Sequence, residues 1–122
     1  MSATILVVDD SAAVRQQVGT ALKQVGFQVV EANDGVQGKQ LIENGDVQCV
    51  VCDVNMPNKN GIEMVEEVKS LDCFKSLPII MLTTEGAPEQ ILRAKKAGAA
   101  GWMVKPFKAE LLIAAIKKLI GM

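Results

Sequence analysis

Histidine is absent from the 122 residues of this sequence. Its absence excludes catalytic triads built on histidine, zinc and haem sites with histidine ligands, and the phosphohistidine of a kinase. An excess of charge of one sign is also lacking, because 13 Lys and Arg residues and 14 Asp and Glu residues leave a net charge of −1. Proteins that bind nucleic acid or an anionic membrane surface generally carry a basic excess. We therefore expect no nucleic-acid partner and no membrane partner.

Long apolar runs are missing too, since no run in the sequence approaches the roughly 18 residues of a membrane-spanning helix. Met1 to Thr4 lack the charged start of an export signal, so we expect no membrane insertion and a cytoplasmic location. The length suits one domain, given a typical size of roughly 150 residues, and 49% of the residues are apolar. Residues 1–122 are therefore predicted to form a single domain with a sizeable core.

Cysteine is scarce and odd in number, which is typical of a reducing compartment. Cys49 and Cys52 have the spacing of redox and zinc motifs, but the segment 47–53 has the composition of a buried strand. Positions three apart on a strand point to opposite faces of the sheet. We therefore interpret these thiols as small core side chains rather than as a metal or disulfide site.

Strand-like apolar runs alternate with helical patterns along the whole chain. The expected strands are 4–8, 27–32, 47–52, 78–83 and 102–104, and helices are expected around 14–25, 36–42, 64–68, 88–97 and 111–119. Strand–helix units joined by short links predict a parallel sheet covered on both faces. A closed barrel of eight such units needs about twice this length. The predicted fold is therefore α/β, an open doubly wound sheet of five parallel strands with five helices.

Polar side chains collect where the predicted strands end, which is where chemistry gathers in open α/β sheets. These residues are Asp9 and Asp10 after the first strand, Asp53 at the third, Thr83 and Thr84 at the fourth, and Lys105 at the fifth. Carboxylates held close together repel one another and favour a divalent cation with oxygen ligands, for which Mg²⁺ is the best fit. The cation, the lysine and a hydroxyl suit the oxygens of a transferred phosphoryl group. Asp53, from a central buried strand, is the best candidate for a carboxylate nucleophile.

Each of these residues also has a simpler explanation. Asp9, Asp10 and Ser11 could serve only to cap the following helix. Asp53 could be an ordinary turn residue, and Lys105 a solvated surface charge. The functional interpretation depends on their coincidence at one edge of the sheet.

Four segments together resemble the receiver domain of bacterial two-component response regulators. They are Val7–Ser11, Asp53–Pro57 with Gly61, Leu82–Thr84 and Lys105–Phe107. The resemblance covers essentially the whole chain and implies a flavodoxin-like strand order 2-1-3-4-5. It also implies that Asp53 accepts a phosphoryl group from the phosphohistidine of a histidine kinase. The implied Mg²⁺ ligands are Asp9, Asp10, Asp53 and the main-chain carbonyl of Asn55.

The same resemblance implies a switch around the phosphoryl group. Lys105 would pair with the phosphoryl oxygens, and Thr83 would move inward to hydrogen-bond them. Trp102 stands where the family usually has Tyr or Phe, the aromatic residue that turns inward when the threonine engages. Its alternative role is that of a bulky half-buried side chain that does not rotate. The peptide before Pro106 is expected to be cis.

Within this family the chain is similar to stand-alone chemotaxis regulators of the CheY type, which have no output domain. That similarity implies a CheA-like kinase as phosphodonor, a flagellar motor switch protein as target, and a phosphatase as a further partner. Asn55 and Glu85 occupy positions that influence hydrolysis of the aspartyl phosphate. The implied docking face carries Ile91, Lys95, Trp102, Lys108 and Ile113, of which Ile113 lies off the apolar stripe of its helix and is expected to be exposed.

Other functions stay open at this point. A phosphate shuttle or sink in another relay would use the same chemistry, and an unphosphorylated binding module would use only the docking face. A flavin binder needs a phosphate-holding loop after the first strand, where Asp9 and Asp10 would repel phosphate. An aspartate-nucleophile phosphatase would carry its nucleophile after the first strand, together with a cap domain. We therefore do not expect this chain to be an enzyme. It would promote only its own phosphorylation and the hydrolysis of its own aspartyl phosphate.

Overall fold

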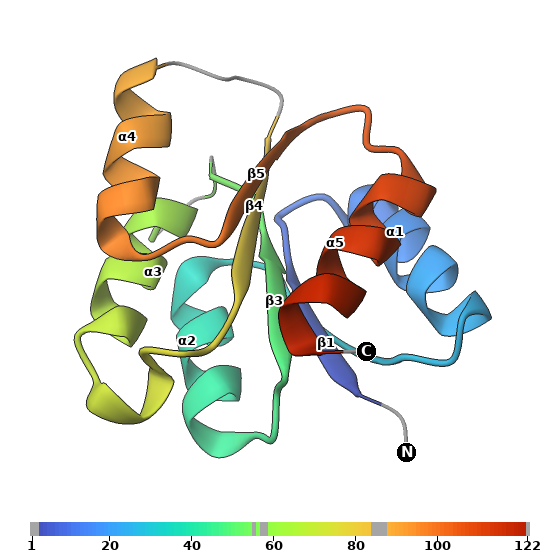
Figure 1. The fold of residues 1–122 in the computed structure, drawn as a ribbon, viewed down its shortest axis with the longest axis horizontal. Helices are drawn as coiled ribbons and strands as arrows, with labels where there is room; N and C mark the ends of the chain where they lie inside the picture. Colours follow the sequence, from blue (N-terminus) through green and yellow to red (C-terminus); the bar gives the residue numbers. More distant parts are fainter. Residues whose placement is uncertain (1–2, 55, 57–58, 84–87, 122) are drawn as a thin grey trace.

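The computed structural model describes residues 3–54, 56, 59–83 and 88–121. Within these residues, strands and helices alternate along the chain (Figure 1). The strands are β1 (Thr4–Val8), β2 (Gln28–Ala32), β3 (Cys49–Cys52), β4 (Ile79–Thr83) and β5 (Gly101–Val104). The helices are α1 (Ala12–Gln24), α2 (Gly35–Asn44), α3 (Gly61–Lys69), α4 (Pro88–Ala97) and α5 (Ala109–Ile120), with a short 3₁₀ turn, η1 (Asp72–Phe74).

The strands form one parallel sheet in the order β2-β1-β3-β4-β5, so the prediction of an open doubly wound sheet is confirmed. Helices α1 and α5 cover one face, and α2, α3 and α4 cover the other (Figure 1). In the register, Val8 lies beside both Ala32 and Cys52, which brings the carboxyl ends of β1, β2 and β3 together.

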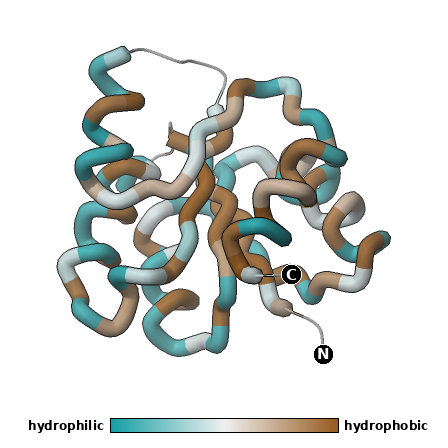
Figure 2. The backbone as a smooth tube through the Cα atoms, viewed as in Figure 1, coloured by the Kyte–Doolittle hydropathy of each residue, from teal (hydrophilic) through white to brown (hydrophobic). Residues whose placement is uncertain are grey.

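Each face of the sheet has its own apolar core. Leu6 and Val8 point toward α2, α3 and α4, whereas Ile5 and Val7 point toward α1 and α5. The strands are accordingly apolar along most of their length, while the polar residues lie mainly on the outer sides of the helices (Figure 2). Burial on both faces explains why these strands have continuous apolar runs.

The two closely spaced cysteines divide between these cores as predicted. Cys49 packs on the α1–α5 side and Cys52 on the opposite side, and both are free thiols. Burial raises the pKa of the Cys49 thiol to about 12, so it stays protonated at neutral pH. Their interpretation as core side chains is therefore confirmed.

The element boundaries differ slightly from the sequence prediction. β2 begins at Gln28 because the amide of Phe27 donates to the Leu22 carbonyl and so belongs to the turn after α1. α5 begins at Ala109, before the first strongly apolar residue, since the first turn of a helix needs no apolar side chain. None of the described helices is both long enough and apolar enough to span a membrane.

Candidate functional site

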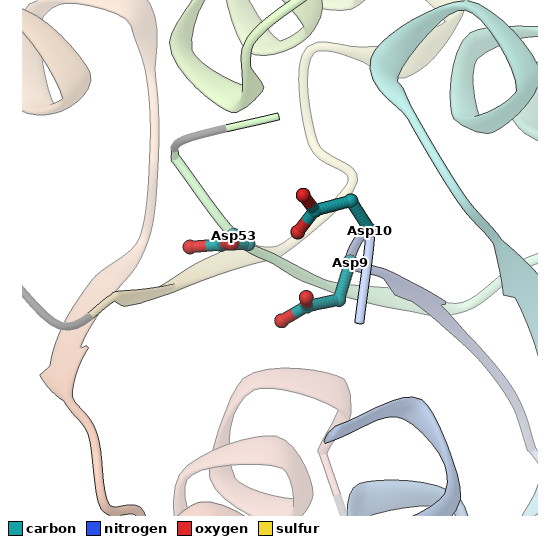
Figure 3. A group of neighbouring side chains, drawn as sticks. All are labelled: Asp9, Asp10 and Asp53. Atoms are coloured by element: carbon teal, nitrogen blue, oxygen red, sulfur yellow. The ribbon is translucent and has the colours of Figure 1, made fainter. Parts of the chain in front are cut away.

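Three carboxylates meet at the carboxyl edge of the sheet. Asp9, Asp10 and Asp53 each offer one oxygen, and these oxygens lie within 4.8 Å of one another (Figure 3). Hydrogen bonds just beyond the strand ends fix the backbone here: the Asp9 amide donates to the Ala32 carbonyl at 3.0 Å, and the Asp53 amide to the Val8 carbonyl at 2.8 Å. Parallel pairing of β1 with β3 therefore places the carboxylates side by side.

Asp9 is 2% exposed, and both of its carboxylate oxygens are bonded. Oδ1 accepts the Ser11 amide at 2.9 Å, and Oδ2 accepts the Lys105 ammonium at 2.8 Å. Its main-chain carbonyl accepts Nη1 of Arg15 at 2.6 Å, and the Arg15 Nε donates to Glu31 at 3.0 Å. Asp9 is thus held from three directions.

The helix-capping alternative is correct for Ser11. Its hydroxyl oxygen accepts the Val14 amide at 3.3 Å and caps α1. Asp9 supports this cap from two residues earlier, but its second oxygen faces Lys105. Helix capping therefore accounts for Ser11 and for only part of Asp9.

Asp53 is 7% exposed and less well compensated than Asp9. Its Oδ1 accepts the Val54 amide at 2.8 Å, while its Oδ2 lies 3.6 Å from the Lys105 ammonium. Burial and the nearby charge of Asp9 raise the pKa of Asp53, and Lys105 and the Val54 amide only partly oppose that rise. The pKa is thus raised first by burial and second by the neighbouring carboxylate, so a bound cation would stabilise the ionised form of Asp53.

Lys105 is the cation of this cluster, with a side chain 15% exposed. Burial alone would lower its pKa, but the hydrogen bond to Asp9 and the charges of Asp53 and Asp9 outweigh burial, so the pKa is raised. Its amide donates to the Thr83 carbonyl at 2.7 Å, which places it beside the end of β4. The peptide between Lys105 and Pro106 is cis, as expected.

The donor set fits a divalent cation with oxygen ligands. Three ionised carboxylates and one ammonium carry a formal charge of −3 + 1 = −2. The available donors are carboxylate oxygens, which hard cations such as Mg²⁺ and Ca²⁺ prefer, and no thiol or imidazole is among them. Asp9, Asp10 and Asp53 could therefore hold Mg²⁺.

Other predicted residues have mixed outcomes. Thr83 is fully buried at the end of β4, beside Lys105. The predictions for Asn55 and Glu85, and that for Thr84, fall outside the described residues. Gly61 approaches the Asp53 main chain so closely that a Cβ would lie 2.0 Å from the Asp53 carbonyl oxygen.

The Arg15–Glu31 pair, in which Arg15 bonds the Asp9 carbonyl, was not predicted from the sequence. Arg15 lies on α1 and Glu31 on β2, and no local spacing relates two such positions. The only indication in the sequence is that Arg15 follows the N-cap Ser11 by four residues. This spacing puts Arg15 in the first turns of α1, near the carboxyl edge of the sheet.

The expected docking residues lie on α4, on β5, and on α5 or its N-cap Lys108. Lys95 and Lys108 are exposed, and Ile91 and Trp102 are half-buried. The expectation that Ile113 is exposed is wrong, because it is half-buried and packs against the core between the sheet, α1 and α5. The apolar stripe of α5 is therefore wider than its spacing predicts. The Trp102 ring packs against the opposite core, and its Nε1 is buried without a hydrogen-bond partner among the described residues.

Comparison with known proteins agrees with this geometry. The response regulator receiver domain family matches residues 5–117. Chemotaxis protein CheY1 of Helicobacter pylori is 39% identical over 119 residues, which cover 96% of each chain. A Campylobacter jejuni chemotaxis protein CheY homolog is 38% identical over 96% of this chain and 92% of its own. The structure of Vibrio cholerae chemotaxis protein CheY4 has a TM-score of 0.91 at 38% identity, covering 98% of this chain and 99% of that one. The chain therefore belongs to the response regulator receiver domain family.

Proposed function

We propose that this chain is a phosphorylation-switched signalling protein of a two-component chemotaxis pathway. Asp53 accepts a phosphoryl group from the phosphohistidine of a CheA-like histidine kinase. The observation that carries this proposal is a buried carboxylate, Asp53, held between a second carboxylate and the Lys105 ammonium at the carboxyl edge of the sheet. Relatives named as chemotaxis proteins support the choice of pathway.

In the transfer step, one Asp53 oxygen forms a bond to phosphorus while the phosphorus–nitrogen bond of the donor breaks. The electron pair of that bond stays with the imidazole nitrogen, so the product is an aspartyl phosphate. Asp9, Asp10, Asp53 and the Asn55 main-chain carbonyl would hold Mg²⁺, which would supply positive charge to the phosphoryl oxygens. Lys105 keeps its bond to Asp9 and offers its remaining N–H groups to the phosphoryl group.

The signal leaves through a change at α4, β5 and α5. The Thr83 hydroxyl hydrogen-bonds the phosphoryl group, and Trp102 moves with it. The altered face, with Ile91, Lys95, Trp102, Lys108 and Ile113, then binds a target protein, for which a flagellar motor switch protein is our candidate. Asn55 and Glu85 set the rate at which the phosphoryl group is hydrolysed, by the chain itself or with a phosphatase. Residues 1–122 act as one receiver domain in the cytoplasm.

Phosphorylation can be tested with a small-molecule donor. The protein is incubated with acetyl phosphate and Mg²⁺, and its intact mass is compared with that of Asp53→Asn. We expect one added phosphoryl group on the wild type, none on the variant, and none after chelation of Mg²⁺. Lack of a mass gain in folded wild-type protein would refute the proposed switch and leave an unphosphorylated binding module.

The target is tested separately with the phosphorylated protein. We expect it to bind a purified flagellar motor switch protein more tightly than Asp53→Asn does. Phosphorylation without any such gain, together with rapid passage of the phosphoryl group to a second carrier, would identify a phosphate shuttle instead.

A further inference from the structure

Lys59 connects the loop that follows Asp53 to two helices. Its ammonium pairs with Glu67 of α3, and Glu67 also accepts the Lys39 ammonium of α2 at 3.3 Å. The main-chain carbonyl of Lys59 accepts the amide of Gly35, the first residue of α2, at 3.1 Å. One loop residue is therefore bonded to α2 through its backbone and to α3 through its side chain.

The contact between Lys59 and α2 is unusually close. A Cβ on Gly35 would lie 2.6 Å from the Lys59 carbonyl oxygen and 2.9 Å from its Cγ, so only glycine permits this approach. The Gly35 amide is among the N-terminal amides of a helix that have no partner within it. Asn60, which follows Lys59, caps α3: its side chain accepts the Glu63 amide, and the Glu63 side chain accepts the Asn60 amide. Two consecutive loop residues thus complete the N-termini of two helices.

The same loop closes against the backbone of Asp53. The Gly61 amide donates to the Val54 carbonyl at 2.9 Å, and Gly61 packs directly on the Asp53 carbonyl. Lys59 lies only two residues before Gly61. The Lys59 backbone is therefore separated from the Asp53 main chain by only two residues and one close backbone contact.

We propose that Lys39, Lys59 and Glu67 form an ionic clamp that holds residues 59–61 against the Asp53 backbone for divalent-cation binding, an inference that rests on the proposed function. Lys59 is a positioning residue here, because its described bonds are to α2 and α3 and not to the clustered carboxylates at the carboxyl edge of the sheet. Its side chain is 21% exposed, and Glu67 is shared between two lysines, whose hydrogen bonds lower its pKa. Because the Glu67 side chain is 40% exposed, what distinguishes this group from an isolated exposed pair is that one carboxylate is shared by two ammonium groups.

The chain provides a matched control one residue away. Glu66, also on α3, accepts two hydrogen bonds from Arg93 of α4, at 2.7 and 3.1 Å. That pair links two helices but has no described bond to the loop. Glu66→Gln and Glu67→Gln therefore remove the same charge from the same helix, and only the second breaks the clamp.

The test is calorimetric titration of each protein with Mg²⁺. We expect Glu67→Gln and Lys59→Met to raise the Kd about two- to fivefold, the effect of losing a partly exposed ion pair. Glu66→Gln and the conservative Lys59→Arg should bind Mg²⁺ like the wild type. Higher ionic strength should reduce the difference in Kd between the wild type and the two clamp variants, because salt screens the charges of the clamp. Equal Kd values for Glu67→Gln, Lys59→Met and Glu66→Gln would overturn the positioning role.

Hydrogen exchange of the Gly35 amide separates the clamp from the proposed function. We expect this amide to exchange faster in Lys59→Met and Glu67→Gln than in Glu66→Gln, with or without Mg²⁺. Unchanged exchange would show that the charges do not hold the loop on α2. A wild-type protein that binds no Mg²⁺ would instead refute the proposed function, while the exchange result would still decide whether the clamp exists.

Discussion

Two regions of the molecule are built in opposite ways. One is the cluster of Asp9, Asp10, Asp53 and Lys105 at the carboxyl edge of the sheet, which we call the acidic rim. The other is the α4–β5 side, which together with α5 we call the response side. On the rim, Asp9 and Asp53 are buried and Lys105 is half-buried, and the three are bonded to one another or to backbone amides. On the α4–β5 side, the Gln90 Oε1 and Trp102 Nε1 atoms are buried without hydrogen-bond partners among the described residues. Unpartnered buried polar atoms cost free energy. The polar groups of the chemical site are thus mostly bonded in advance, although burial of the Asp53 charge has a cost, whereas the response side retains unpartnered polar atoms that a rearrangement could satisfy.

Exposed large apolar side chains occur at several places, as at Val25 (44%) and Val36 (43%), but those described as more than half exposed all lie on α4, β5 or α5. Leu92 on α4 is 54% exposed and Val104 on β5 is 52% exposed, both on the response side. A preorganised rim lowers the cost of reaching the transition state, because its dipoles and charges need not reorient. A response side with poorly matched groups can change conformation at smaller cost. This contrast leads to four predictions, given from the largest expected effect to the smallest.

The largest effect on stability is expected from adding a methyl group at Gly61, where the chain packs directly on the Asp53 backbone. Gly61→Ala should lower the free energy of unfolding by about 3 kcal/mol, because its Cβ would lie 2.0 Å from the Asp53 carbonyl oxygen. Gly101→Ala, on β5, is the control, since its Cβ would meet Ile80 at an ordinary 3.7 Å. Urea denaturation should show no loss for the control. Similar losses for both variants would contradict the contrast between the two regions.

Removal of the Asp53 charge should stabilise the metal-free protein. The pKa of Asp53 is raised in the folded state, so the folded protein binds more protons than the unfolded chain between the two pKa values. Stability therefore falls as pH rises through that interval. Without divalent cations, Asp53→Asn should raise the free energy of unfolding at pH 7 by about 1 kcal/mol. The gain should vanish at a pH low enough to protonate Asp53 in both the folded and the unfolded protein. Urea denaturation at several pH values measures this, and a gain that is independent of pH would show that the charge is not its cause.

Loss of a satisfied polar group on the rim should be destabilising. Ser11→Ala removes the oxygen that accepts the Val14 amide and caps α1. The free energy of unfolding should fall by about 1 kcal/mol. Thermal or urea denaturation gives the value, and Ser11→Asp, which restores an acceptor, should recover most of it.

Loss of an unsatisfied polar group on the response side should have the opposite sign. Gln90→Met keeps a side chain of similar length but removes the buried Oε1 that has no described partner. We expect stability to increase by up to about 1 kcal/mol in the same denaturation assay. A decrease would mean that the amide makes a contribution that the structure does not explain.

The fold and the rim could be predicted from sequence because both depend on local patterns. Alternating apolar runs define strands and helices, and parallel strands end at one edge, so Asp9, Asp53 and Lys105 had to come together. Strand burial also placed Cys49 and Cys52 on opposite faces correctly. These features need only periodicity and chain order.

Other parts depend on contacts between distant elements and could not be predicted. Nothing near Lys59 in the sequence indicates Glu67 as its partner, or Lys39 as the second cation on Glu67, because the shared contact requires the packing of α2 beside α3. Ile113 was expected to be exposed because it lies off the main stripe of α5. It is half-buried because α5 packs against both the sheet and α1, which widens the covered surface.

The central claim is that phosphorylation of Asp53 changes the response side, and Trp102 reports this directly as the only tryptophan in the chain. The measurement is its emission spectrum with acetyl phosphate and Mg²⁺, recorded beside the intact mass, for the wild type and Asp53→Asn. We predict a change in emission that follows the mass gain in the wild type, disappears as the phosphoryl group is hydrolysed, and is absent from the variant. A full mass gain with an unchanged Trp102 spectrum would contradict the account.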